Sequence, residues 1–305
     1  MAAESRQKEN DQGQQKRSPQ EYASMSGEEL LHELEMAGRH PDLALLEELL
    51  KRREEVTPTL LKWLAQEIDY FAGSDGSGRP DRDRADWSDD DPRWYRAIHA
   101  GHLLIAYREP KAIPLFITIL RDPRLDLLQE WFETALSHYG PALVPHLLAL
   151  LQDESIPYEE RLNAIAPLTE IATRYVEVRP TVLKALRELL PVDESGQVTL
   201  TDRDLKRMDG EQFGKLVDFL SFLVIGLLDL RDKRSLPAIK TLYDAGLILE
   251  WLAGSYEAVE RELQAPQRPQ FKHSWDILEA YSDLRKVELE SEQENWTEPQ
   301  ESDEG

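Results

Sequence analysis

Two segments decide the fold of this chain: IPLFITIL at residues 113–120 and VPHLLALL at residues 144–151. Each has a proline at its second position, and the second segment follows the first after 31 positions. Apolar residues spaced three and four positions apart predict an amphipathic helix with one buried face. Another helical run precedes each segment, so the repeated unit is predicted to be a pair of helices. A period of roughly 30–47 residues is typical of arrays in which helix pairs stack.

Related patterns occur on both sides of this region. PTLLKWL at residues 58–64 resembles PTVLKAL at residues 180–186, and the sequence leading to Pro237 resembles the sequence leading to Pro114. No segment shows the sustained two-residue alternation of a half-buried strand. We therefore predict an all-α protein, an α-solenoid of stacked antiparallel helix pairs that forms one continuous array rather than two domains.

The array is predicted to cover residues 25–264, with a long Asp-rich loop at 72–92 and a polar linker at 193–202. Residues 1–24 contain almost no large apolar side chain and are predicted to be a disordered tail, because they bury too little surface to offset the entropy of ordering. Residues 265–305 are predicted to hold a Pro- and Gln-containing break, a short amphipathic segment and a disordered acidic tail.

Two prolines lead to predictions about individual helices within the array. Thr57-Pro58 is expected to begin a helix, because proline at the first helical position loses no hydrogen bond. Pro167 is expected to kink the helix predicted to begin at Pro157, because an interior proline removes one backbone hydrogen bond.

Composition narrows the classes of partner. The chain has 305 residues, of which 41% are hydrophobic, and a net charge of −23. An acidic surface repels phosphate backbones and anionic lipid headgroups, so neither nucleic acid nor membrane is an expected partner. The absence of cysteine excludes disulfides, thiolate metal sites and cysteine nucleophiles.

The N-terminal sequence lacks the apolar core of a signal peptide, so we expect a cytoplasmic protein. The most apolar run, Leu216–Leu228, contains Asp218 and is shorter than the ~20 residues that a membrane span needs. It is predicted to be a buried helix.

The junctions EPKAIP at residues 109–114 and GPALVP at residues 140–145 resemble those of the HEAT repeat family of α-solenoids. The segment from Trp94 to Leu263 is also similar to bacterial HEAT-like repeat proteins. This resemblance implies a non-enzymatic scaffold that binds a protein or peptide on its helical surface. The alternative that it implies is a HEAT-like maturation factor or lyase that acts on a tetrapyrrole-carrying client protein.

No residue pattern supports a particular catalytic reaction. His99 and His102 are three positions apart, whereas the zinc-protease motif has histidines four apart with a glutamate between them. The aspartates of the 72–92 loop lack the glycine and glutamate of the EF-hand pattern, which favours a solvated loop over a calcium site. We therefore predict no catalytic residue, no metal site and no cofactor, and favour a non-enzymatic protein.

A stripe of large apolar residues lies near the C-terminus, at Trp275, Ile277, Leu278, Tyr281 and Leu284. In a helix most of these side chains share one face, which predicts either that the segment folds back onto the array or that it binds a partner. The candidate partner surface consists of residues from this stripe and from the helix expected at residues 94–105: Tyr95, His99, His102, Trp275 and Tyr281.

Overall fold

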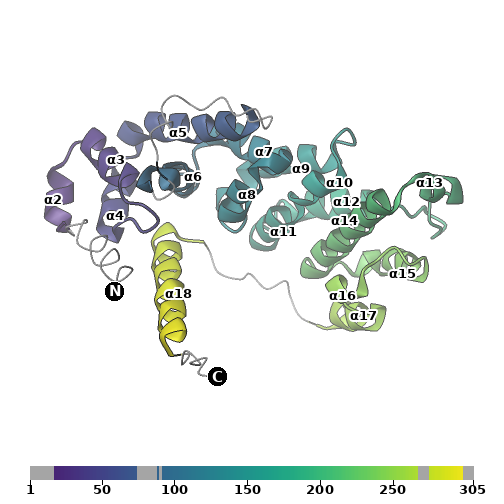
Figure 1. Ribbon diagram of the computed structural model, residues 1–305. Helices are drawn as coiled ribbons and strands as arrows, with labels where there is room; N and C mark the ends of the chain where they lie inside the picture. Colours follow the sequence, from purple (N-terminus) through teal and green to yellow (C-terminus); the bar gives the residue numbers. More distant parts are fainter. Residues whose placement is uncertain (1–16, 74–87, 89–90, 267–274, 298–305) are drawn as a thin grey trace, which may run out of the picture. The chain divides into compact units, whose positions relative to one another are not determined.

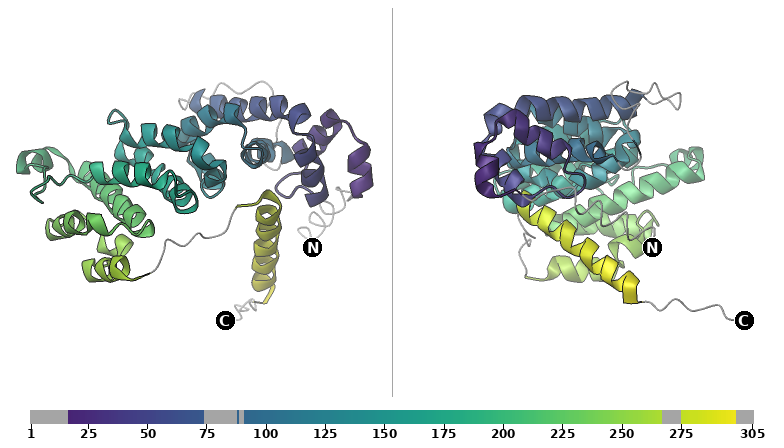
Figure 2. Two further views of the ribbon diagram at one scale, coloured as in Figure 1. Left: turned by 180° about the vertical axis from the view of Figure 1, so that it is seen from behind. Right: turned by 60° about the vertical axis from the view of Figure 1, so that its left-hand side comes forward.

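The computed structural model describes residues 17–73, 88, 91–266 and 275–297 (Figures 1 and 2). Every regular element in these ranges is a helix, which confirms the predicted all-α class; the only pairing of strand type among them is an isolated bridge between Val192 and Val198. The chain divides into two compact units. Unit 1 is Met1–Glu109 with Trp275–Gly305, and unit 2 is Pro110–Ser274. The predicted 25–264 array thus includes parts of both units.

Unit 1 is built around α5 and α6, which pack against each other, while α3 contacts α4, α5 and α6. The last helix of the chain, α18, packs against α4 and α6. The helices of unit 1 are α2 (Pro19–Ser24), α3 (Gly27–Glu35), α4 (Leu43–Lys51), α5 (Arg53–Gly73), the 3-10 helix η1 (Pro92–Tyr95), α6 (Arg96–Ala106) and α18 (Ile277–Thr297).

Helix α2 lies inside the range 1–24 that was predicted to be a tail. Ser18 and Glu21 cap it reciprocally, Pro19 occupies its first position, and Tyr22 is buried. These local contacts and the one buried ring provide the stabilisation that the composition of residues 1–24 does not suggest. Residues 1–16, most of the 72–92 loop, residues 267–274 after the start of the Pro- and Gln-containing break, and residues 298–305 lie outside the described residues. The acidic tail was predicted to be disordered, but α18 continues into it as far as Thr297.

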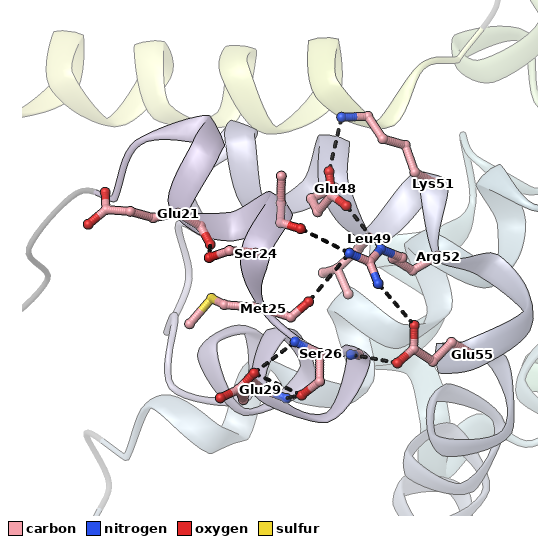
Figure 3. Close-up of polar contacts among 12 residues, drawn as sticks. Glu21, Ser24, Met25, Ser26, Glu29, Glu48, Leu49, Lys51, Arg52 and Glu55 are labelled. Carbon is pink, nitrogen blue, oxygen red and sulfur yellow. Dashed lines mark hydrogen bonds and ion pairs between the residues drawn. The ribbon is translucent and has the colours of Figure 1, made fainter.

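Arg52 joins α2 and α3 to α4 and α5 (Figure 3). Its guanidinium pairs with Glu48 at 3.0 Å and donates to the backbone carbonyls of Ala23 and Met25. Glu55, which also pairs with Arg52, accepts from the backbone N–H of Gly27 at 2.7 Å. One cation therefore satisfies carbonyl groups at the end of α2 and fixes the start of α5.

The prediction that a helix begins at Thr57-Pro58 is wrong. Helix α5 begins at Arg53 and continues through Pro58 to Gly73. The hydroxyl of Thr57 donates to the Arg53 carbonyl at 2.7 Å. Pro58 lies beyond the first turn, so its missing N–H leaves the carbonyl of Glu54 without its usual intrahelical partner, yet the helix continues.

The helices of unit 2 are short apart from α14, which packs against α10, α11 and α12. They are η2 (Pro110–Ala112), α7 (Ile113–Arg121), η3 (Pro123–Leu125), α8 (Asp126–Phe132), η4 (Leu136–Ala142), α9 (Val144–Gln152), α10 (Tyr158–Leu162), α11 (Ile165–Arg174), α12 (Arg179–Glu188), α13 (Asp202–Arg207), α14 (Gly210–Asp229), η5 (Lys233–Ser235), α15 (Leu236–Asp244), α16 (Glu250–Ala253) and α17 (Tyr256–Gln264).

Four of these helices, α7, α9, α12 and α15, share one design. Each has nine or ten residues, a single proline as its second residue, and a buried apolar face. Helix α9 contacts both α7 and α12. The repeated segments at residues 113–120 and 144–151 therefore form α7 and α9, and they pack against each other.

The predicted buried helix at Leu216–Leu228 lies within α14, and most of its apolar side chains are buried. None of the helices in the described ranges combines the length and the apolar character needed to cross a bilayer. Pro167 is associated with a break rather than a kink: α10 ends at Leu162 and α11 begins at Ile165. Because Pro167 has no N–H, a continuous helix would leave the carbonyl of Asn163 without its usual partner.

Candidate functional site

All five residues of the candidate partner surface lie in unit 1, and the structure brings them into one cluster. Tyr95 ends η1, His99 and His102 lie on α6, Trp275 precedes α18, and Tyr281 lies on α18. The ring of His99 lies 5.4 Å from that of Tyr281 and 6.3 Å from that of Tyr95. The ring of His102 lies 5.4 Å from Tyr281 and 5.7 Å from Trp275.

The hydroxyl of Tyr281 lies between two imidazoles. Its oxygen is 2.5 Å from Nδ1 of His99 and 3.0 Å from Nδ1 of His102. Nε2 of His99 is 2.6 Å from the carbonyl oxygen of Gly38, which only accepts hydrogen bonds, so this nitrogen carries the proton. In neutral His99, Nδ1 then accepts from the Tyr281 hydroxyl, and the Tyr281 oxygen accepts from His102. The hydrogen bonds therefore run in one direction: His102 donates to Tyr281, Tyr281 donates to His99, and His99 donates to the carbonyl of Gly38.

Gly38 supplies this carbonyl from a tight turn between α3 and α4. Its φ is +59°, in the left-handed region, where a residue with a side chain costs roughly 1 kcal/mol. Glycine therefore allows the turn to hold its carbonyl beside His99 without backbone strain.

Burial keeps His99 and Tyr281 uncharged. The pKa of His99 is lowered to about 3, mainly because burial disfavours the imidazolium; the hydrogen bond to the Gly38 carbonyl opposes this shift, and His102 and His40 lower the pKa further by smaller amounts. Burial also raises the pKa of Tyr281 well above its usual value. Both residues therefore stay neutral near pH 7 and act as hydrogen-bonding groups rather than as charges.

Further contacts hold α18 in place. Ile277 is 2% exposed, and Arg285 donates to the carbonyls of His40 and Pro41. Asp276 accepts from the backbone N–H groups of residues 278 and 279 and so caps the helix. The C-terminal stripe is thus folded back onto unit 1. Trp275, Leu278 and Leu284 keep part of their surface exposed.

The cluster is closed to a substrate while α18 is docked, because His99, His102 and Tyr281 are 1%, 5% and 4% exposed. In the described ranges, no three His, Asp or Glu side chains come together as metal ligands would. In this state the cluster recognises and orients α18; it does not present an open surface to another molecule.

Unit 2 contains a groove that the sequence analysis did not predict. It has a volume of about 800 Å³ and lies between α10, the end of α12, the turn closed by the Val192–Val198 bridge, and α14. Its wall combines apolar side chains with exposed glutamates and a hydroxyl, including Tyr158, Glu154, Glu188, Leu189, Thr199 and Leu216.

Arg161 also lines this groove and is itself buried. Its guanidinium carbon lies 4.9 Å from the ring centre of Phe219 and 5.4 Å from that of Tyr158, and its Nε donates to the Leu151 carbonyl at 2.8 Å. Burial lowers the pKa of Arg161 from its usual value, although the group stays charged. Because the cation is covered by two rings, the exposed charges of the groove are those of its glutamates.

The groove was missed because its wall comes from segments that are far apart in the sequence. The segment 193–202 was interpreted as a plain linker. A signal was present: DES occurs at residues 153–155 and again at 193–195, and in both places the aspartate accepts from the serine two positions later. Such turns end one segment and direct the next.

A smaller hollow of about 290 Å³ lies over α7 and α9 in the same unit, lined by residues that include Ile117, Arg121, His146 and Asp153.

The chain was compared with models of protein families, with curated protein sequences and with solved structures. It matches none of them.

Proposed function

We propose that this chain is a non-enzymatic interaction scaffold and that the 800 Å³ groove of unit 2 binds an extended segment of a partner protein. The helix pairs of unit 2 are taken to stack as in a HEAT-like solenoid. Support for this arrangement comes from α7, α9 and α12, which have one design and contact one another in sequence order. Stacked repeats of this kind expose extended surfaces suited to protein binding.

The groove is the observation that carries the proposal. Its volume lies in the range of small ligand sites, and its wall mixes apolar anchors with a few polar groups. Glu154 and Glu188 are exposed along it, and the carbonyl end of α12 adds partial negative charge. This chemistry favours a segment that carries a lysine or arginine between apolar residues.

The test is affinity capture from native lysate with wild-type protein and with the variant Glu188→Arg/Thr199→Arg. Both residues are exposed, so the variant should fold, while its added side chains fill the groove and reverse its charge. The control is Thr181→Arg, which adds an exposed arginine to α12 outside the groove. One recurrent stoichiometric partner should be captured by wild type and control and be lost with the groove variant. Equal capture by all three proteins would remove the groove from the proposal.

A further inference from the structure

The surface of unit 1 beneath α18 recognises that helix through three positions spaced four residues apart. Ile277 is buried, the Tyr281 hydroxyl joins two imidazoles, and Arg285 donates to two backbone carbonyls. Residues at this spacing lie along one face of a helix. The helix thus presents an aliphatic residue, a tyrosine and an arginine in the pattern aliphatic-x3-Tyr-x3-Arg.

The polar part of this surface makes it selective. An apolar side chain in place of Tyr281 would leave the buried nitrogens of His99 and His102 facing no hydroxyl, and unsatisfied buried polar groups weaken association. A side chain that only fills an apolar core does not need to pair a hydroxyl with buried imidazole nitrogens in this way. An apolar anchor with a few placed polar groups is the arrangement found where a groove binds an amphipathic helix.

The docked helix is also separable from the rest of unit 1. Helix α18 is the last described helix, and its main contacts are with α4 and α6. The packing of α5 on α6 and of α3 on α4 and α5 does not involve it. Departure of α18 would therefore expose the imidazoles and carbonyls of the site without removing the other helix contacts of the unit.

We propose that the surface formed by α4, the turn at residues 37–41 and α6 is a binding site for an amphipathic helix of a partner protein with the pattern aliphatic-x3-Tyr-x3-Arg. Helix α18 is its resident occupant and competes with the partner. An occupant on the same chain acts at high effective concentration. The partner's apparent affinity is therefore its intrinsic affinity multiplied by the fraction of protein whose site is free. This site lies in unit 1 and is independent of the groove in unit 2.

The test uses a fluorescein-labelled peptide with the sequence of residues 275–290 and three forms of the full-length chain: wild type, Ile277→Ala/Tyr281→Ala, and Glu279→Ala/Asp283→Ala. The first variant removes the buried anchors of α18 and frees the site. The second is the matched control, because it changes two exposed residues of the same helix. Fluorescence anisotropy should show that the peptide binds the anchor variant at least about tenfold more tightly than it binds wild type or control.

A second peptide, with phenylalanine at the position of Tyr281, should bind the anchor variant about tenfold more weakly, because it lacks the hydroxyl. Circular dichroism checks that the anchor variant is folded. If it is not, Tyr281→Phe in the full chain retains the ring and should bind the first peptide severalfold more tightly than wild type. The proposal is overturned if the folded variant does not bind the peptide at millimolar concentration, if wild type and variant bind equally, or if the phenylalanine peptide binds undiminished.

Discussion

At the scale of single residues, His99 sets a pH dependence for unit 1. Its pKa is about 3 in the folded protein and about 6.5 when exposed. Between these values the unfolded chain binds more protons, so stability rises with pH across that window. The contribution of neutral His99 is complete above about pH 6.5 and is lost as the pH falls towards 3.

We therefore expect the free energy of unfolding of unit 1 to fall by up to about 1.4 kcal/mol per pH unit below about pH 6.5. Urea denaturation at pH 7.5, 6 and 5, monitored by hydrogen exchange of the backbone amides of α6, would measure this change in the free energy of unfolding. The variant His99→Gln lacks the titrating ring and should show a flatter dependence. Parallel pH profiles for variant and wild type would rule out this role of His99.

Two arginines show how similar local sequences differ in their surroundings. Arg108 and Arg231 both have positive φ, 50° and 57°, and both end a helix with the same pair of backbone hydrogen bonds. Each is followed by a buried acid that pairs with an arginine of another helix: Glu109 with Arg53, and Asp232 with Arg187. The side chain of Arg108 is exposed, whereas Arg231 pairs with Glu262 at 3.0 Å.

Because glycine adopts positive φ without strain, Arg108→Gly should stabilise the protein by roughly 0.5–1 kcal/mol. Arg231→Gly relieves the same backbone strain but loses the contacts to Glu262, so its gain should be smaller or reversed. Urea denaturation of the two variants would compare them. A loss of stability in Arg108→Gly would indicate that its side chain contributes more than its exposure suggests.

At the scale of elements, the short helices of unit 2 depend on one buried face. Leu147, on α9, is fully buried. The side chain of Lys184, on α12, is 73% exposed, and its Nζ lies 3.7 Å from Oε1 of Glu188. Leu147→Asp should destabilise the protein by several kcal/mol, because a carboxylate would be buried without a partner. Lys184→Asp should change stability by roughly 0.5 kcal/mol or less. Thermal denaturation followed by circular dichroism would measure both, and equal damage would contradict the assigned faces.

A turn motif also repeats, once before η1 in unit 1 and once before η3 in unit 2. Asp91-Pro92-Arg93 and Asp122-Pro123-Arg124 are 31 positions apart, and in each the aspartate accepts from the backbone N–H and the guanidinium of the arginine. The arginine lowers the pKa of the aspartate in both turns. This repeat has the same period as the proline-led helices, so a search for polar repeats would have found it.

At the scale of the whole molecule, the C-terminal helix belongs to unit 1 although unit 2 precedes it in sequence. Truncation after Gln264 removes α18 and should reduce the stability of unit 1 while leaving unit 2 unchanged. Hydrogen exchange should speed up in α4 and α6 and stay the same in α9 and α14. Unchanged exchange in α6 would mean that α18 contributes nothing to the stability of the unit.

The sequence by itself determined the helical class, the repeated α7 and α9 segments, and the apolar character of the C-terminal stripe. These follow from spacing along the chain, because a helix places residues three and four apart on one face whatever surrounds it. Boundaries were less predictable. The cap of α2 is a local Ser-x-x-Glu pattern at residues 18–21, but the burial of Tyr22 and the passage of α5 through Pro58 are not specified by any local pattern.

Only the tertiary structure decided that Tyr281 lies between His99 and His102. The tyrosine lies 182 and 179 positions from the two histidines, and nothing in the spacing of either segment specifies the other. The groove of unit 2 has the same origin, since α10, α12, the 192–198 turn and α14 meet there only after folding. Sequence periodicity shows which face of a helix is buried, but the partner of that face depends on how the whole chain packs.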